Sequence, residues 1–224
     1  MNILVYDSST EACSISLKAN NKIYSYFKIA PRQHNKLMLS EIKKLINSAG
    51  ITMSDLDYIS YGKGPGSFVG VRLSAAITQG LAFPYKTPVI GFSSMHAVAI
   101  NVYHKYKNKK ITIIKDAKMG DLYIGTYLFD NTLDMIIPVI EYSVKKDQFK
   151  ISIDPDSICI GDGCPQVMEK LPTNIICSDL VYPCTELIFP YLEYKISLGE
   201  YGSALSQQPI YLQGTSNWKK INER

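Results

Sequence analysis

The sequence predicts an α/β protein built from two lobes that begin alike. Over the first half, short apolar runs alternate with longer amphipathic stretches. That alternation is typical of a mixed sheet with helices packed on its faces. The second half starts as the first does, with an apolar run that ends at an aspartate and continues into a polar loop and another strand pattern. A length of 224 residues is sufficient for two such lobes.

The first elements indicate a three-stranded antiparallel opening followed by a helix. Three apolar runs have the length and composition of strands: 3–6, 13–17 and 22–29. Asn20 and Asn21 separate the last two runs and suit a turn that needs positive φ. A helix is predicted over 35–49, because apolar residues recur there at helical spacing and Gly50 follows the pattern.

The chain then alternates between strands and helices up to residue 106. Strands are predicted at 57–61 and 89–92, and helices at 67–82 and from Ser93 or Ser94 to about 106. The resulting order, β-β-β-α-β-α-β-α, is that of one lobe of an actin-like or sugar-kinase-like (ribonuclease H-like) fold. We therefore assign residues 1–106 to a first actin-like lobe.

Residues 107–224 are assigned to a second lobe, because the strand patterns at 111–115 and 122–128 repeat the opening of the first. Beyond Asn131 the signals are shorter. They predict a strand at 157–160 and helices at 166–171 and 186–198. Trp218 is expected to pack the C-terminal tail back onto the body of the protein.

Composition narrows the functional classes. The net charge of +4 is smaller than a nucleic-acid-binding face usually requires. Five cysteines without a C-x-x-C pair argue against a disulfide framework and a zinc site. The N-terminus lacks the pattern of a signal peptide, and no apolar run approaches the length of a membrane span. We expect a cytoplasmic protein with no membrane contact.

The residues that could support catalysis form no recognisable motif. His34, His96 and His104 lack the i,i+3 or i,i+4 spacing of a helical metal pair. The serines have no G-x-S-x-G setting, although a Ser-His-Asp triad stays open because its members need not be adjacent in the chain. We therefore predict no catalytic residue, no metal and no cofactor.

Two strand-end segments could contact a nucleotide. In phosphate-handling folds of this shape, hairpins after the first strand of each lobe hold phosphates with backbone N–H groups, and glycine allows the close approach. The hairpin after Asp7 contains no glycine, and the one after Asp116 has only Gly120 at its far end. Asp7, Ser9, Thr10 and Asp116 are thus candidates for a vestigial or shared nucleotide site, or ordinary strand-end residues.

The helix at 67–82 has a row of small residues that predicts close helix packing. Gly70, Ser74 and Thr78 are spaced by four, as are Ala76 and Gly80. Three further residues join them as candidate partner-binding residues: Leu37 and Leu39 on the preceding helix, and Arg72 as a hydrogen-bonding anchor. The alternative is that all of these residues face the core of their own lobe.

The glycine-rich loop carries a resemblance to a known family. The segment from Gly64 to Arg72, G-P-G-S-F-V-G-V-R, resembles the signature of the TsaB family. Four other segments resemble the family in the same order along the chain: 7–14, 30–34, 116–123, and 209–212 together with 218–220. The match is weak only over 131–150.

This resemblance implies an actin-like fold with a shortened second lobe and a role in tRNA modification. It implies a non-catalytic scaffold subunit that works with the catalytic paralogue TsaD and the ATPase TsaE. Together they transfer threonylcarbamoyl to the tRNA adenosine adjacent to the anticodon. The expected assemblies are a homodimer or a heterodimer with TsaD, with tRNA bound through the complex. The alternatives are a small-molecule kinase, a glycoprotease-like peptidase of the same fold, or a tRNA-binding protein.

Overall fold

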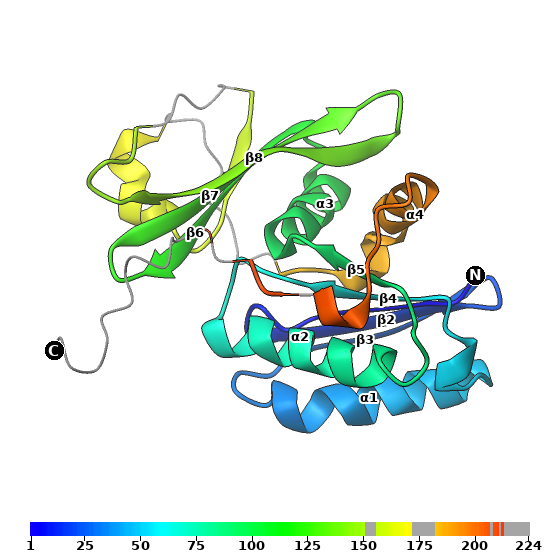
Figure 1. The fold of residues 1–224 in the computed structure, drawn as a ribbon. Coiled ribbons are helices and arrows are strands. Elements are labelled where there is room, and N and C mark those ends of the chain that lie inside the picture. Colours follow the sequence, from blue (N-terminus) through cyan, green and yellow to red (C-terminus); the bar gives the residue numbers. More distant parts are fainter. Residues whose placement is uncertain (151–155, 172–181, 207, 211, 213–224) are drawn as a thin grey trace, which may run out of the picture.

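A computed structural model describes residues 1–150, 156–171, 182–206, 208–210 and 212. The described chain forms two sheets with helices between and around them (Figure 1). Trp218 and Cys177 lie outside the described residues. No helix within the described part is long and apolar enough to cross a membrane.

The first sheet has the strand order β3-β2-β1-β4-β5. Its strands are β1 (Ile3–Asp7), β2 (Ala12–Ala19), β3 (Lys22–Ile29), β4 (Tyr58–Gly62) and β5 (Val89–Phe92). The first three strands are antiparallel neighbours, as predicted, whereas β4 and β5 run parallel to β1. Asn20 and Asn21 have φ of 51° and 58°, so both adopt the left-handed conformation that the predicted turn needs.

Helices cover both faces of this sheet (Figure 1). On one face, α1 (His34–Ala49) and α2 (Phe68–Ala82) enclose a core with the side chains of alternate β1 and β2 residues. On the other face, α3 (Ser94–Tyr106) and α4 (Phe189–Ser197) pack against the remaining β1 side chains and β5. Strands β1 and β4 are therefore buried on both faces, which explains their nearly continuous apolar sequences.

The second sheet has the order β8-β7-β6-β9 and repeats the antiparallel opening of the first. Its strands are β6 (Lys110–Lys118), β7 (Asp121–Asp130), β8 (Met135–Lys145) and β9 (Ile158–Ile160). The sequence patterns missed β8. This strand lies at the sheet edge and contains Pro138 opposite an irregular register, and both features remove the regular alternation of a strand.

Residues 185–206 belong spatially to the first sheet rather than to the second. The Thr185 hydroxyl forms hydrogen bonds with the hydroxyls of Ser14 and Ser16, at 3.0 and 2.8 Å respectively. Gly202 pairs with Val89, and Ala204 joins the core beside α2. Of the range 107–224, the described residues 185–206 therefore pack on the first lobe. The predicted α/β class is confirmed.

Candidate functional site

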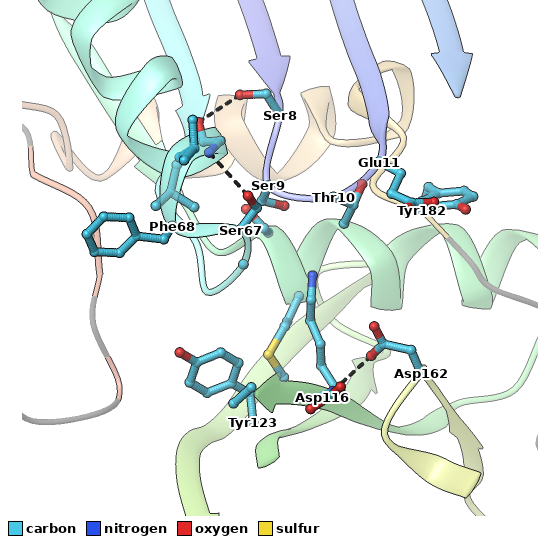
Figure 2. Close-up of a pocket in the computed structure, with 18 of the residues that line it drawn as sticks. Ser8, Ser9, Thr10, Glu11, Ser67, Phe68, Asp116, Tyr123, Asp162 and Tyr182 are labelled. Carbon is cyan, nitrogen blue, oxygen red and sulfur yellow. Dashed lines mark hydrogen bonds between the residues drawn. The ribbon is translucent and has the colours of Figure 1, made fainter. Parts of the chain in front are cut away.

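A cleft of about 1530 Å³ lies between the two lobes. One wall is formed by the hairpin after β1 and the start of α2, and the other by the end of β6 and the loop after β9. Figure 2 shows Ser9 and Thr10 on the first wall and Asp116, Tyr123 and Asp162 on the opposite one. Ligands of open α/β sheets bind beyond the carboxyl ends of the strands, and this cleft has that position.

The hairpin after β1 is docked tightly against the start of α2. The Ser8 hydroxyl donates to the Gly70 carbonyl oxygen at 2.8 Å, so the Ser74 hydroxyl, 2.7 Å away, donates to Ser8. The Ser67 amide donates to the Ser9 carbonyl oxygen at 2.7 Å. A Cβ on Gly66 would lie 2.5 Å from that same oxygen. Glycine in this loop therefore serves contact with the hairpin of the same lobe.

Asp7 is fully buried beneath the hairpin. Its carboxylate accepts the Ser9 amide at 2.7 Å and the Ser94 hydroxyl at 2.6 Å. A Cβ on Gly62 would overlap Asp7, so that glycine is required for the carboxylate to fit. Of the four candidate nucleotide residues, the structure places Ser9, Thr10 and Asp116 on the cleft wall and Asp7 behind it.

The second wall combines acidic and basic side chains. The Asp116 amide donates to Asp162 at 2.9 Å, and the Lys118 ammonium pairs with the Asp116 carboxylate at 2.6 Å. Burial acts to raise the pKa of Asp116, but the hydrogen bonds from Lys118 outweigh it, and the net shift is downward. Burial lowers the pKa of the Lys115 amine, while Asp162 and Asp7 act in the opposite direction.

The lining of the cleft is balanced in charge. The charged side chains among its described residues are those of Arg32, Lys115, Lys118, Glu11, Asp116 and Asp162. Two buried polar atoms on the first wall, Ser9 Oγ and His34 Nε2, have no hydrogen-bond partner among the described residues. No group of His, Cys, Asp or Glu side chains in the described part is arranged to hold a metal ion. The described residues that line the cleft thus carry no excess of the positive charge that favours a polyphosphate.

The predicted small-residue row on α2 faces inward. Gly70, Ser74 and Thr78 all contact the first lobe, and Ser74 and Thr78 are fully buried. The Thr78 hydroxyl donates to the Ser74 carbonyl oxygen and accepts from Tyr6 at 2.6 Å. A Cβ on Gly70 would lie 1.9 Å from the Ser8 carbonyl oxygen. The prediction that these three residues form an external surface is therefore wrong, because the sheet already occupies the space beside them.

A different face of α2 is exposed, next to α1. Val69 is 73% exposed, Ala76 and Gly80 are also exposed, and a Cβ on Gly80 would meet nothing within 4 Å. Leu39 of α1 is 53% exposed. The remaining two candidates are half-buried: Leu37, which packs on the core, and Arg72, whose guanidinium lies 3.3 Å from the Phe68 ring centroid. We call Leu39, Phe68, Val69, Ala76 and Gly80 the α1–α2 surface.

The two lobes are joined by hydrogen bonds at the start of α3. Glu141 of β8 accepts from the Ser93 hydroxyl at 2.5 Å and from the Tyr127 hydroxyl at 2.6 Å. His96 Nε2 donates to the Ile136 carbonyl oxygen at 2.8 Å. Burial lowers the pKa of His96 to about 4, so the ring is neutral near pH 7. These bonds fix the start of α3 to the second sheet.

Phe68, Val69 and Lys115 are among the site residues that sequence reasoning overlooked. Phe68 and Val69 begin a helix after a glycine-rich loop, and the sequence predicts that an apolar pair at this position packs against the loop. Lys115 precedes Asp116 in a strand and reads as an ordinary surface cation, although it lines the cleft. Their exposure follows from how α2 and β6 are oriented, and no local sequence signal reports that orientation.

Comparisons with known proteins agree on one family. The family model described as TsaD, tRNA N6-adenosine threonylcarbamoyltransferase, matches residues 21–149. The tRNA threonylcarbamoyladenosine biosynthesis protein TsaB of Buchnera aphidicola subsp. Schizaphis graminum is 32% identical, with 85% of this chain and 92% of that protein covered. TsaB of Escherichia coli is 26% identical, with 99% and 98% covered.

Solved structures show the same fold. YeaZ from Pseudomonas aeruginosa has a TM-score of 0.84 and 27% identity, covering 94% of this chain and 99% of that one. A second structure from this organism, described as an uncharacterized protein with similarity to peptidase YEAZ, has a TM-score of 0.86 and 28% identity, with 95% and 99% covered. The actin-like fold predicted from the sequence is thus confirmed, and the chain belongs to the TsaB family of tRNA threonylcarbamoyladenosine biosynthesis proteins.

Proposed function

We propose that this chain is a non-catalytic subunit that supports threonylcarbamoyl transfer to tRNA by binding a catalytic paralogue of the TsaD type. The α1–α2 surface is the binding site, and the same surface can pair two copies of this chain when the paralogue is absent. TsaE completes the assembly, and tRNA is bound through the complex. The chain itself supplies no reacting group.

The docked hairpin after β1 is the observation that carries this proposal. Its Ser9 amide donates to the Asp7 carboxylate, and the amide of Ser67, the N-cap residue of α2, donates to the Ser9 carbonyl oxygen. A phosphate would need such N–H groups free and directed into the cleft. The balanced charge of the lining supports the same conclusion. We infer that the hairpin stabilises the lobe and that the reacting groups are on the catalytic partner.

The α1–α2 surface has the character of a protein-binding site. Exposed Leu39, Phe68 and Val69 give an apolar area, and apolar patches on a folded protein commonly mark interaction sites. Ala76 and Gly80 keep the neighbouring part of α2 thin, so that a helix of another subunit can approach its backbone closely. A paralogue with a similar fold would present a comparable pair of helices, and a self-complementary patch also suits a two-fold dimer.

The kinase and peptidase alternatives gain no support from the geometry. A kinase of this fold would need phosphate-binding amides, and the Ser9 and Ser67 amides at this position are already bonded within the lobe. A serine peptidase would need a histidine bonded to a serine hydroxyl, and none of the three histidine rings makes such a bond in the described structure. One-to-one micromolar binding of Mg-ATP to the isolated chain, measured by calorimetry, would revive the kinase alternative.

A matched pair of leucine substitutions tests the binding site. Leu39 on α1 and Leu198 at the end of α4 are both 53% exposed, so arginine fits at either position without crowding the fold. We expect Leu39→Arg to abolish binding to the TsaD-type partner, because a charge buried without a partner in an interface costs several kcal/mol. Leu198→Arg serves as the control and should bind normally.

The readout is the mass of the mixed proteins by light scattering, with circular dichroism to verify folding. Ala76→Arg provides a second disruption on α2, since its side chain is exposed. Full binding by both folded variants, or equal loss in the Leu198→Arg control, contradicts the proposed surface.

A further inference from the structure

One ammonium group in the interlobe cleft has no ion-pair partner among the described residues. Lys115 lies near the end of β6 and lines the cleft. Its neighbour Lys118 is paired with Asp116, whereas no hydrogen bond or ion pair holds the Lys115 ammonium in the described structure. The Lys115 side chain is half-buried, and burial lowers the pKa of its amine. A cation withdrawn from water without a counter-ion is destabilised, so this position favours an incoming anion.

Two carboxylates influence Lys115 without pairing with it. Asp162 and Asp7 both act to raise the pKa of the Lys115 amine, so the ammonium lies within electrostatic range of both walls of the cleft. Asp162 accepts the Asp116 amide at 2.9 Å. Asp7 accepts the Ser9 amide at 2.7 Å from beneath the hairpin after β1. Both carboxylates therefore have other hydrogen bonds, and the net shift of the Lys115 pKa is downward.

An unpartnered hydroxyl lies on the opposite wall. Ser9 lines the cleft across from Asp116 and Asp162 (Figure 2). Its Oγ atom is buried and has no hydrogen-bond partner among the described residues, although its amide and carbonyl groups are both bonded. Because Asp7 holds the Ser9 amide and also acts on Lys115, the hydroxyl and the ammonium border the same part of the cleft. Buried polar groups nearly always have a partner, so this hydroxyl points to a ligand.

The wall of the cleft around Lys115 is apolar. Ile113 precedes Lys115 by two residues in β6 and therefore lies on the same face of the strand. Tyr123 of β7 is opposite Lys115 in the antiparallel pair. Both line the cleft, as do Met95 and Val98 of α3. An anion bound at the ammonium would thus have apolar side chains beside the rest of its body.

We propose that the interlobe cleft binds a small organic carboxylate, with one carboxylate oxygen on the Lys115 ammonium and the other on the Ser9 hydroxyl. The hydroxyl turns toward the ligand by rotation about its Cα–Cβ bond, and the apolar body of the ligand packs against Ile113. The neighbouring Asp116 and Asp162 repel a second negative charge, so a monocarboxylate is preferred over a phosphate dianion. We call Lys115, Ser9 and Ile113 the carboxylate site.

The carboxylate site and the α1–α2 surface share no residue. Carboxylate binding therefore does not depend on the proposed function, and either proposal can fail alone. Leu39→Arg, which disables the α1–α2 surface, should leave carboxylate binding unchanged. Lys115→Met, which disables the carboxylate site, should leave binding to the TsaD-type partner unchanged.

Nuclear magnetic resonance titration of the whole chain tests the site, with 3-methylbutanoate as the probe. We expect saturable shifts of the Ser9 and Lys115 amide signals with a dissociation constant of about 1 mM, which suits so small a ligand. The uncharged amide of the same shape, 3-methylbutanamide, should bind at least about tenfold more weakly, and so should inorganic phosphate. The bound carboxylate should also raise the pKa of the Lys115 amine, which the unmodified chain reports through the side-chain signals of that lysine.

A matched pair of lysine substitutions locates the anion. Lys115→Met keeps the length of the side chain but removes its charge, and should weaken 3-methylbutanoate binding at least about tenfold. Ser9→Ala should weaken it by about tenfold as well. Lys118→Met removes the same charge from an exposed lysine that is paired with Asp116, and should change binding less than about threefold. Circular dichroism verifies folding.

Four results would overturn the proposal. The first is the absence of saturable binding by 3-methylbutanoate at about 10 mM. The second is equal binding of the amide or of phosphate, and the third is an unchanged pKa of Lys115 in the saturated, unmodified chain. The fourth is a folded Lys115→Met variant that binds as tightly as Lys118→Met.

Discussion

Two glycines on α2 should respond in opposite ways to the same substitution. Gly70 faces the hairpin after β1, whereas Gly80 faces open space on the α1–α2 surface. In a helix, alanine is favoured over glycine by about 1 kcal/mol when nothing obstructs the added methyl group. We therefore expect Gly80→Ala to raise the free energy of unfolding by about 1 kcal/mol.

At Gly70 the same gain is outweighed by a clash. The added Cβ would lie 1.9 Å from the Ser8 carbonyl oxygen and 3.0 Å from its carbon, so the hairpin or the helix has to move. Inserting a methyl group into a well-packed site typically costs about 1–3 kcal/mol of stability, and occasionally more. Because the obstruction is backbone, we expect a cost at the upper end and a net loss of about 2 kcal/mol in Gly70→Ala.

Urea denaturation followed by circular dichroism measures both free energies of unfolding. In a chain of this size, the expected changes correspond to melting temperatures about 3 °C higher for Gly80→Ala and about 6 °C lower for Gly70→Ala. The difference between the two variants cancels the shared helix preference, so it reports the clash alone. A Gly70→Ala protein as stable as Gly80→Ala would refute the inward orientation of this side of α2.

Three further variants probe the hydrogen bonds that hold the lobes. Burial lowers the pKa of His96 from 6.5 to about 4, so acid protonates this histidine in the unfolded chain before it does so in the folded one. The free energy of unfolding should therefore fall by about 3 kcal/mol as the pH is lowered from 6.5 to 4. His96→Phe should reduce this pH dependence, as measured by urea denaturation. Glu141→Ala leaves the hydroxyls of Tyr127 and Ser93 without their acceptor and should cost about 2 kcal/mol, with faster hydrogen exchange at the start of α3. Ser8→Ala removes the bonds to α2 and should lower stability by about 1–2 kcal/mol in the same titrations.

Most of the first lobe could be predicted from sequence because its signals are local. Strand β3 at 22–29 and β5 at 89–92 have the predicted bounds, since turn residues flank compact apolar runs. Ser67 and Ser93 cap their helices as expected. Strand β8 was missed because Pro138 and the irregular pairing beside it interrupt the alternation that identifies a strand.

The candidate sites were less predictable, because orientation depends on tertiary packing. The four-residue spacing of Gly70, Ser74 and Thr78 correctly indicates close contact on one side of α2. Spacing does not say whether the neighbour is another subunit or the hairpin of the same lobe. Ala76 and Gly80, on another side of the same helix, remain candidates for partner binding, and their role stays a prediction, as do the roles of Leu37, Leu39 and Arg72.

The central claim is that this chain acts through its α1–α2 surface, where Phe68 and Val69 border the interlobe cleft, and not through the charged residues of that cleft. The most direct test is threonylcarbamoyl transfer to tRNA in a reconstituted system that contains the TsaD-type subunit, TsaE and the activated adenylate. We predict that Leu39→Arg abolishes transfer, whereas Asp116→Asn in the cleft leaves it unchanged, and that the chain alone is inactive. Loss of transfer in a folded Asp116→Asn variant that still binds its partner would contradict the account.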